Sequence, residues 1–210
     1  MSYTELYAEV VNGNESKVIE LTKSLLEAGY DPLEIMNKGL IAGMDIVGPR
    51  FKNGEMFVPE VLLSARALHS GINIVKEALV GTDIPCIGKI VLGTVKSDLH
   101  DIGKNLVGMM MESAGFKVID LGVDVPEETF IEAVKEHKPD ILALSALLTT
   151  TMPNMKSVID ALKENGLRDK VKVIIGGAPV SQNFADEIGA DGYAPEAASA
   201  AALCKQLIAE

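Results

Sequence analysis

The sequence has 210 residues, of which 48% are hydrophobic, so the chain can bury a core of substantial size. Its 30 acidic and 19 basic residues give a net charge of −11, which repels nucleic-acid phosphates and anionic lipid surfaces. We therefore expect no nucleic-acid and no membrane partner. The two cysteines, Cys86 and Cys204, lie far apart and form no metal-binding motif, which favours a reducing cytoplasm as the location.

The first part of the chain has the apolar pattern of helices. Apolar residues recur at three- and four-residue spacing over residues 18–26, behind Asn14, a residue type that caps helices. A third helix is expected over residues 32–51 and a fourth from Pro59, because proline suits the first helical turn. Four helices with short connections predict a small bundle, which we assign to residues 1–82.

Beyond a linker placed at residues 83–87, short apolar runs alternate with amphipathic helices. This alternation is typical of a parallel sheet covered by helices on both faces. Residues 88–210 are therefore predicted to form a five-stranded α/β domain of the flavodoxin-like (Rossmann-like) type, whose ligands bind beyond the carboxyl ends of the strands. The expected strands are 89–93, 117–121, 141–145, 171–175 and 192–193, and the expected helices are 103–113, 127–136, 154–164, 181–187 and 197–208.

The loop after the first strand carries Asp98-Leu99-His100-Asp101-Ile102-Gly103, at the sheet edge where this fold builds its sites. His100 can ligate a metal through one ring nitrogen while Asp98 accepts a hydrogen bond from the other and fixes the tautomer. Gly103 would let the backbone approach a bulky ligand. Taken by itself, the pattern is explained equally well by a solvated loop histidine.

Two further strand ends carry small or polar residues at the same edge. The third strand ends in Ser145-Ala146-Leu147 and the fourth in Gly176-Gly177. Small residues at these places would leave a slot between the strand ends, and the Ser145 hydroxyl could hydrogen-bond a base held in it. An ordinary turn after a buried strand would also explain each feature separately.

The three motifs Asp-x-His-x-x-Gly, Ser-x-Leu and Gly-Gly, in this order, resemble the B12-binding domain that holds cobalamin with its dimethylbenzimidazole tail inserted into the protein. By this resemblance His100 is the lower axial ligand of the cobalt. Thr151 stands where the methionine synthase module has a hydroxyl residue that completes a hydrogen-bonded chain with Asp98 and His100, and this catalytic triad would couple the cobalt state to protonation. The resemblance implies cofactor contacts at Asp98, His100, Asp101, Ile102, Gly103, Ser145, Leu147, Thr149, Thr151, Gly176, Gly177 and Ala178.

Residues 43–66 are similar to the helical cap of the methyl-carrying module in cobalamin-dependent methionine synthase, so the resemblance covers essentially the whole chain. Val58 departs from that family, which has a larger Leu at this place. From the residues alone, Phe51 and Val58 would be core residues between helices. The likeness instead implies that four cap residues lie over the upper corrin face: Phe51, Met56, Val58 and Val61.

A cap followed by a B12-binding domain resembles the small corrinoid proteins that serve methanol, methylamine, quaternary-amine and aryl-ether methyltransferases. The resemblance implies a carrier subunit of a corrinoid-dependent methyltransferase, with a substrate:corrinoid methyltransferase that places a methyl group on Co(I). A second methyltransferase would move it from methyl-Co(III) to tetrahydrofolate or coenzyme M, and a reductive activase would be a further partner. The sequence does not distinguish the methyl donor, the final acceptor or the oligomeric state.

Three other functions share some of these features. A B12-binding subunit of a radical isomerase has the three sheet motifs but lacks a cap with a residue like Phe51. A B12 sensor that acts on DNA would need a basic recognition helix, which the net charge opposes. A flavodoxin-like interaction domain would bind no corrinoid at all. The visible absorption spectrum of the protein after mixing with cobalamin separates this last function from the others.

Overall fold

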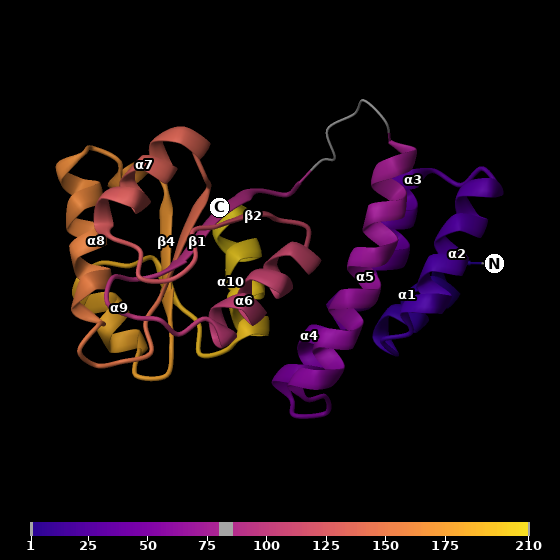
Figure 1. Ribbon diagram of the computed structural model, residues 1–210, viewed down its shortest axis with the longest axis horizontal. Coiled ribbons are helices and arrows are strands. Elements are labelled where there is room, and N and C mark those ends of the chain that lie inside the picture. Colours follow the sequence, from indigo (N-terminus) through magenta and orange to yellow (C-terminus); the bar gives the residue numbers. More distant parts are fainter. Residues whose placement is uncertain (1, 80–85, 210) are drawn as a thin grey trace. The chain divides into compact units, whose positions relative to one another are not determined.

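The computed structural model describes residues 2–79 and 86–209 (Figure 1). The chain divides into two compact units, one made mainly of residues before 86 and the other mainly of residues from 86 onward. The linker expected at residues 83–87 lies mostly outside the described residues, which include only its last two positions, Cys86 and Ile87.

The first unit is helical, as expected. Asn14 caps the second helix by accepting a hydrogen bond from the Lys17 amide, and Asp31 caps the next one in front of Pro32. The elements are α1 (Tyr3–Val11), α2 (Glu15–Glu27), α3 (Pro32–Glu34), the π-helix η1 (Ile35–Ile41), α4 (Ala42–Lys52) and α5 (Val58–Ala78).

The third helix differs from the expectation. The sequence pattern predicted one uniform α-helix over residues 32–51, but the run consists of α3, the π-helical η1 and α4 without a break. A π-helix shifts the hydrogen-bond partner by one residue and leaves the apolar spacing nearly helical, so periodicity does not reveal it. Ile35 and Leu40 of this segment are fully buried.

The second unit is the predicted α/β domain. Its five strands are all parallel and lie in the order β2-β1-β3-β4-β5, the flavodoxin-like arrangement. Helices α6 and α10 cover one face of the sheet and α7, α8 and α9 cover the other (Figure 1). The elements are β1 (Lys89–Thr94), α6 (Ile102–Ser113), β2 (Lys117–Asp120), α7 (Glu127–His137), β3 (Ile141–Ser145), α8 (Pro153–Glu164), η2 (Arg168–Lys170), β4 (Lys172–Gly176), α9 (Gln182–Ile188), β5 (Gly192–Tyr193) and α10 (Ala197–Ala209).

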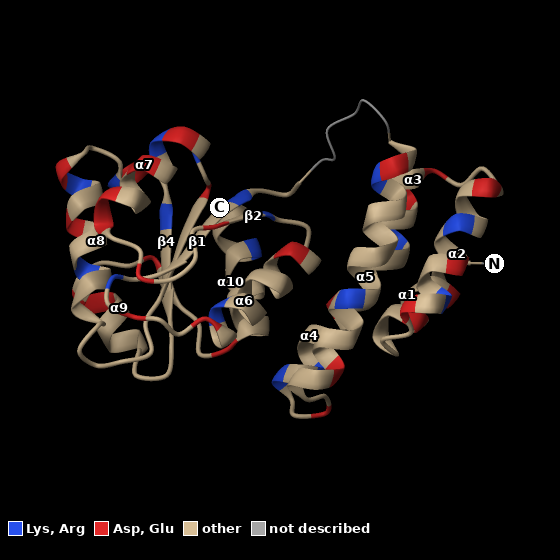
Figure 2. Cartoon of the chain, in the orientation of Figure 1, with Lys and Arg blue, Asp and Glu red and all other residues tan. Residues whose placement is uncertain are grey.

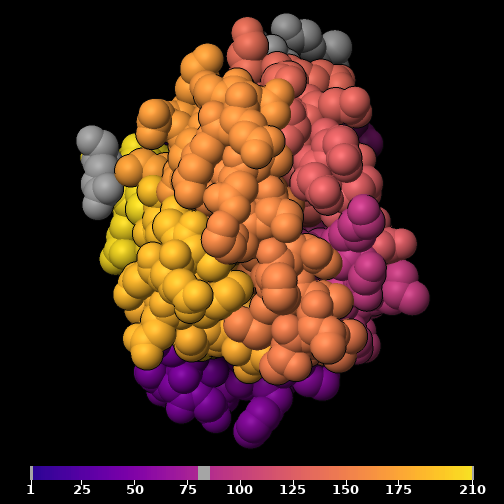
Figure 3. All heavy atoms as spheres, turned by 90° about the vertical axis from the view of Figure 1, so that its left-hand side faces the viewer, coloured from indigo at the N-terminus to yellow at the C-terminus, as the bar shows by residue number. Residues whose placement is uncertain are grey.

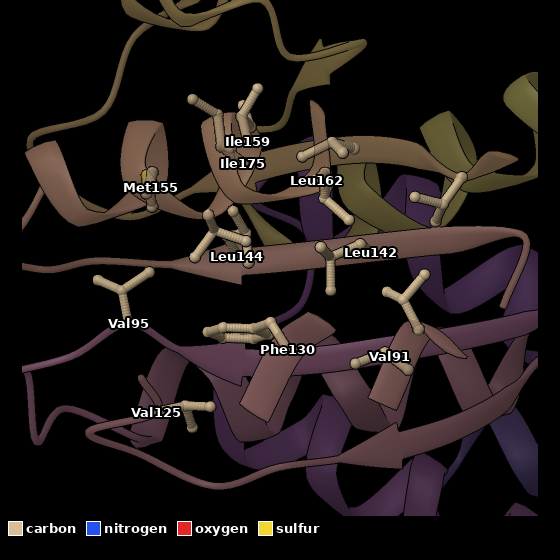
Figure 4. Packing of buried hydrophobic residues seen from close by; sticks show 14 of the residues in the cluster. Val91, Val95, Val125, Phe130, Leu142, Leu144, Met155, Ile159, Leu162 and Ile175 are labelled. Carbon is tan, nitrogen blue, oxygen red and sulfur yellow. The ribbon is translucent and has the colours of Figure 1, made fainter. Parts of the chain in front are cut away.

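The strands carry charged residues only at their ends, as the tan centres of the strands in Figure 2 show. Strands buried on both faces need this continuous apolar pattern. On one face, Phe130 of α7 and Ile159 of α8 pack with Leu142 and Leu144 of β3 in a dense cluster (Figure 4). This core makes the sheet a rigid base for the loops at its edges.

The carboxyl edge of the sheet brings the three sequence motifs into line. In the strand register, Thr94 pairs with Ser145, and Ser145 pairs with Gly176. Strands β1 and β3 are neighbours whose chain connections leave in opposite directions, which is the point where this fold opens a crevice for ligands. Among the described helices, none is long and apolar enough to cross a membrane.

Candidate functional site

Hydrogen bonds join His100 and Asp98, in the loop after β1, to Thr151, which lies between β3 and α8. His100 Nδ1 lies 2.7 Å from Asp98 Oδ1, and the Thr151 hydroxyl donates to Asp98 Oδ2 at 2.7 Å. The Leu147 amide donates to the same Oδ2 at 2.8 Å. Asp98 is fully buried, whereas the His100 side chain is 48% exposed. Because Nδ1 faces Asp98, Nε2 is the ring nitrogen that can take a ligand from outside.

The electrostatics of Asp98 set the state of this imidazole. Burial raises the pKa of the Asp98 carboxyl, but hydrogen bonds from Thr151, from the Leu147 amide and from His100 outweigh that effect and hold the pKa well below its usual range. Asp98 is therefore a carboxylate at neutral pH and favours a proton on Nδ1. A neutral imidazole with its proton on Nδ1 presents a lone pair on Nε2, the form that binds a metal.

Exposed apolar side chains lie near the histidine in the chain and in the neighbouring loop. Leu99 in the loop after β1 is 73% exposed and Ile102 at the start of α6 is 84% exposed, and Leu147 and Leu148 are 39% and 42% exposed in the loop after β3. The two loops are neighbours, since the Leu147 amide bonds Asp98. A group of exposed apolar residues around one polar ligand atom is typical of a site for a large, mostly apolar molecule.

The glycine pair at the end of β4 has a structural cause. Gly177 has φ +133°, and a Cβ on it would lie 1.8 Å from the Ala146 carbonyl oxygen, so no side chain fits there. The Ala146 amide also donates to the Gly176 carbonyl at 3.2 Å. The second and third motifs are thus in backbone contact, and a substitution at Gly177 would disturb the fold as well as any slot beside it.

The other predicted contacts of the α/β unit lie at the same edge. Ser145, Gly176 and Gly177 are half-buried and Thr151 is buried. At Gly103 an added Cβ would meet nothing within 4 Å, so space is open beside the histidine loop. The exposed members of the set are Asp101, Ile102, Gly103, Leu147, Thr149 and Ala178. An available ring nitrogen, exposed apolar side chains and open space fit a corrinoid, which is a metal-bearing macrocycle.

The four expected cap residues lie in the helical unit and differ in exposure. Val58 is 40% exposed and Phe51 is half-buried, whereas Met56 is 8% exposed and Val61 is fully buried. Val58 and Phe51 therefore have side-chain surface that a ligand could contact, whereas the fully buried Val61 has none. The exposed apolar surface near Val58 also includes Leu62, which is 39% exposed and lies one helical turn further along α5.

Some contacts of the site left no signal in the sequence. Leu147 is an expected cofactor contact, but the bond from its amide to Asp98 was not predicted, because every residue other than proline has such a donor. The Thr94 hydroxyl donates to the His100 carbonyl at 2.9 Å, although Thr94 reads as an ordinary strand residue. The exposed Leu148 continues the apolar pattern at Leu147 and could have been noticed as an apolar residue beyond a strand end.

Comparison with known proteins agrees with this geometry. The family model of the B12 binding domain matches residues 88–202, and a second model with the same description matches residues 3–76. The chain is 50% identical over 193 residues to the dimethylamine corrinoid protein of Methanosarcina barkeri, covering 91% of this chain and 89% of the relative. It is 46% identical over 205 residues to dimethylamine corrinoid protein 2 of Methanosarcina acetivorans, covering 97% and 94%.

Two solved structures are similar over nearly the whole chain. One is the methanol:cobalamin methyltransferase complex from Methanosarcina barkeri, with a TM-score of 0.88 and 37% identity, covering 97% of this chain and 78% of that one. The other is a cobalamin-binding protein from Desulfitobacterium hafniense, with a TM-score of 0.84 and 34% identity, covering 99% and 98%. The expected family and cofactor are therefore confirmed, and this chain belongs to the corrinoid proteins that bind their cofactor in a B12-binding domain.

Proposed function

We propose that this chain is a methyl carrier in which His100, held by Asp98 and Thr151, is the lower ligand of the corrinoid cobalt. The observation that carries the proposal is the hydrogen-bonded chain from Thr151 through Asp98 to His100 Nδ1, which leaves Nε2 for a metal. It stands in a domain that matches the B12-binding family. When bound, the corrinoid supplies the cobalt that accepts and releases the methyl group.

The residues of the chain have distinct tasks in this proposal. His100 would hold the cobalt through Nε2, and the Asp98 carboxylate keeps the proton on Nδ1. Thr151 holds the second carboxylate oxygen, so Asp98 cannot rotate away from the ring. Ser145 and the space beside Gly176 would receive the nucleotide tail. The apolar residues Leu99, Ile102 and Leu147 would contact the macrocycle and exclude water from it.

We assign residues 1–82 as the cap and residues 88–210 as the cobalamin-binding domain. The match of separate family models to residues 3–76 and 88–202 supports this division. Phe51 and the exposed Val58 are the cap residues that would shield the upper face of the corrin. Because a valine is smaller than the leucine of methionine synthase, it would leave the methyl group less covered.

The relatives suggest the partner enzymes. Dimethylamine corrinoid proteins are 46% and 50% identical to this chain, so we propose a methylated amine as the methyl donor. A substrate:corrinoid methyltransferase would deliver the methyl group, a second enzyme would pass it to tetrahydrofolate or coenzyme M, and a reductive activase would restore the cofactor. The exposed free thiol of Cys86 supports a cytoplasmic location.

The test is reconstitution of the purified protein with methylcobalamin, followed by visible spectroscopy and transfer assays. Wild-type protein should retain the cofactor through gel filtration and give a histidine-bound spectrum. A protein that stays colourless would disprove the proposal. In separate reactions with methylamine-specific and with methanol-specific methyltransferases, methylation of the reduced protein from dimethylamine or trimethylamine, but not from methanol, would establish the donor class.

A further inference from the structure

Two residues at the carboxyl edge have an unusual backbone conformation. Ser97 has φ +66° and Asp124 has φ +53°. Residues with a side chain rarely occupy this left-handed region, and such conformations persist only where surrounding contacts hold them. Lys138, the C-cap of α7, is the other residue with a positive φ among the non-glycine residues that the structure describes. Ser97 lies three positions before His100, so its conformation bears on the site.

Ser97 and Asp124 hold each other in place. The Ser97 amide donates to Asp124 Oδ1 at 2.6 Å, and the Asp124 amide donates to the Asp98 carbonyl at 2.9 Å. Asp124 thus contacts the histidine loop with both its side chain and its backbone, although it belongs to the loop after β2. In Figure 3, magenta residues from the part of the chain that follows β1 lie beside salmon residues from the part that follows β2.

The opposite flank of the same loop is held from α8. The Asn154 side-chain amide donates to the Lys96 carbonyl at 2.7 Å. Asp124 and Asn154 therefore bond two consecutive residues of the loop, Ser97 and Lys96, from different elements of the sheet edge. Both side chains bond loop backbone, and each brings an element far along the chain to the segment just before the ligand.

We propose that Asp124 and Asn154 are positioning residues for His100. This inference rests on the proposed role of His100 as the cobalt ligand. The bond from Asp98 orients the imidazole relative to Asp98, but it does not by itself fix the direction in which the backbone leaves β1. Bonds at Lys96 and Ser97 fix that direction. Without them the loop takes other conformations, and Nε2 spends less time where a ligand can be held.

The test measures how much of the bound cobalamin is coordinated by histidine, from the visible spectrum of reconstituted protein. Asp124→Ala removes the acceptor, and we expect the ratio of histidine-bound to histidine-free cofactor to fall by roughly 3- to 10-fold, the range for one lost hydrogen bond. Asn154→Ala should shift the ratio in the same direction. Glu128→Ala is the matched control, because it also removes a carboxylate from an exposed position beside this edge, at the start of α7.

Two rescue variants separate positioning from charge and from general stability. Asp124→Asn keeps an acceptor oxygen and tolerates the left-handed backbone, so its spectrum should match the wild type. Adding Ser97→Gly to Asp124→Ala should recover part of the histidine-bound fraction, because glycine adopts φ +66° without strain. Thermal unfolding of each apoprotein checks that the fold is retained.

The outcomes discriminate between this inference and the proposed function. If His100→Ala shifts the spectrum but Asp124→Ala and Asn154→Ala leave it unchanged, the positioning role is wrong and the ligand role stands. If Glu128→Ala lowers the histidine-bound fraction as much as Asp124→Ala, the effect is one of charge and the inference is overturned. If His100→Ala itself leaves the spectrum unchanged, the proposed ligand is wrong. Should Asp124→Ala not fold, Asn154→Ala decides the result.

Discussion

The two edges of the sheet in the α/β unit both carry charged residues, but they use them differently. At the amino edge, Asp140 and Arg168 line a hollow together with Asp191. Asp140 accepts from the Lys89 amide at 2.7 Å, and Arg168 pairs with Asp191 at 2.8 Å. Arg168 also donates to the Gly189 carbonyl at 2.7 Å. These charges hold strands and loops of the chain itself.

At the carboxyl edge, the Asp98 carboxylate likewise accepts hydrogen bonds from the chain itself, from the Thr151 hydroxyl and the Leu147 amide. The difference is His100, whose Nδ1 faces Asp98 and whose Nε2 is the cobalt ligand in our proposal, beside the exposed Leu99 and Ile102. Under that proposal the site is not marked by a hollow lined with charged residues. It is marked by a ring nitrogen that faces outward beside exposed apolar side chains.

The largest expected effect comes from removing that outward atom. His100→Ala should convert the spectrum of bound methylcobalamin entirely from the histidine-bound to the base-off form. The unfolding free energy should fall by roughly 1–2 kcal/mol, because the buried Asp98 carboxylate loses the hydrogen bond from the His100 ring. Visible spectroscopy and urea unfolding of the apoprotein measure the two effects. A histidine-bound spectrum in this variant would mean that another residue is the ligand.

Asp98→Asn tests the contribution of the buried carboxylate at the carboxyl edge. The substitution removes the charge that four hydrogen bonds stabilise, so we expect a loss of roughly 2–3 kcal/mol in unfolding free energy at pH 7. Since the folded pKa of Asp98 lies below the unfolded value of about 3.9, the carboxylate stabilises the fold above that pH and the benefit is lost as the pH falls below it.

Urea unfolding of both apoproteins between pH 7 and pH 3 checks this prediction. The wild-type advantage over Asp98→Asn should be constant near neutral pH and shrink below about pH 4. An advantage that stays the same down to pH 3 would show that the charge of Asp98 contributes nothing to the stability of the fold.

Asp191→Ala makes the corresponding change at the amino edge. Arg168, with 18% of its side chain exposed, would lose its carboxylate, and the Val173 amide would lose an acceptor at 2.6 Å. We expect a loss of roughly 1–2 kcal/mol in unfolding free energy and no change in the cobalamin spectrum. A spectral shift as large as that of His100→Ala would contradict the prediction that charged residues at the amino edge only stabilise the fold.

The smallest effect on stability is expected for Ile102→Ser. Ile102 is 84% exposed, so the unfolding free energy should change by less than about 0.5 kcal/mol, while the dissociation constant for cobalamin should rise by roughly 2- to 10-fold through lost apolar contact. Ile208→Ser, in the hollow at the amino edge, is the control and should leave that constant unchanged. Isothermal titration with both variants gives the comparison.

Much of the fold follows from local patterns in the sequence. Strands such as β3, Ile141–Ser145, are unbroken apolar runs, and their alternation with amphipathic helices leaves few topologies besides a doubly wound sheet. The π-helix η1 was missed because its apolar spacing is close to that of an α-helix. Strand β4 runs from Lys172 to Gly176 and not over the expected residues 171–175, because strand ends depend on pairing with a neighbouring strand.

The sequence by itself determined that His100 and Asp98 stand in one loop, because two residues of separation place them together in any loop conformation. It determined Thr151 only through the likeness to a known module. The tertiary structure alone decided that Thr151 and Leu147 reach Asp98, and that Asp124 and Asn154 reach the residues before His100. These contacts join positions 27 to 58 residues apart, which come together only when parallel strands pair in register and bring their carboxyl ends to one edge.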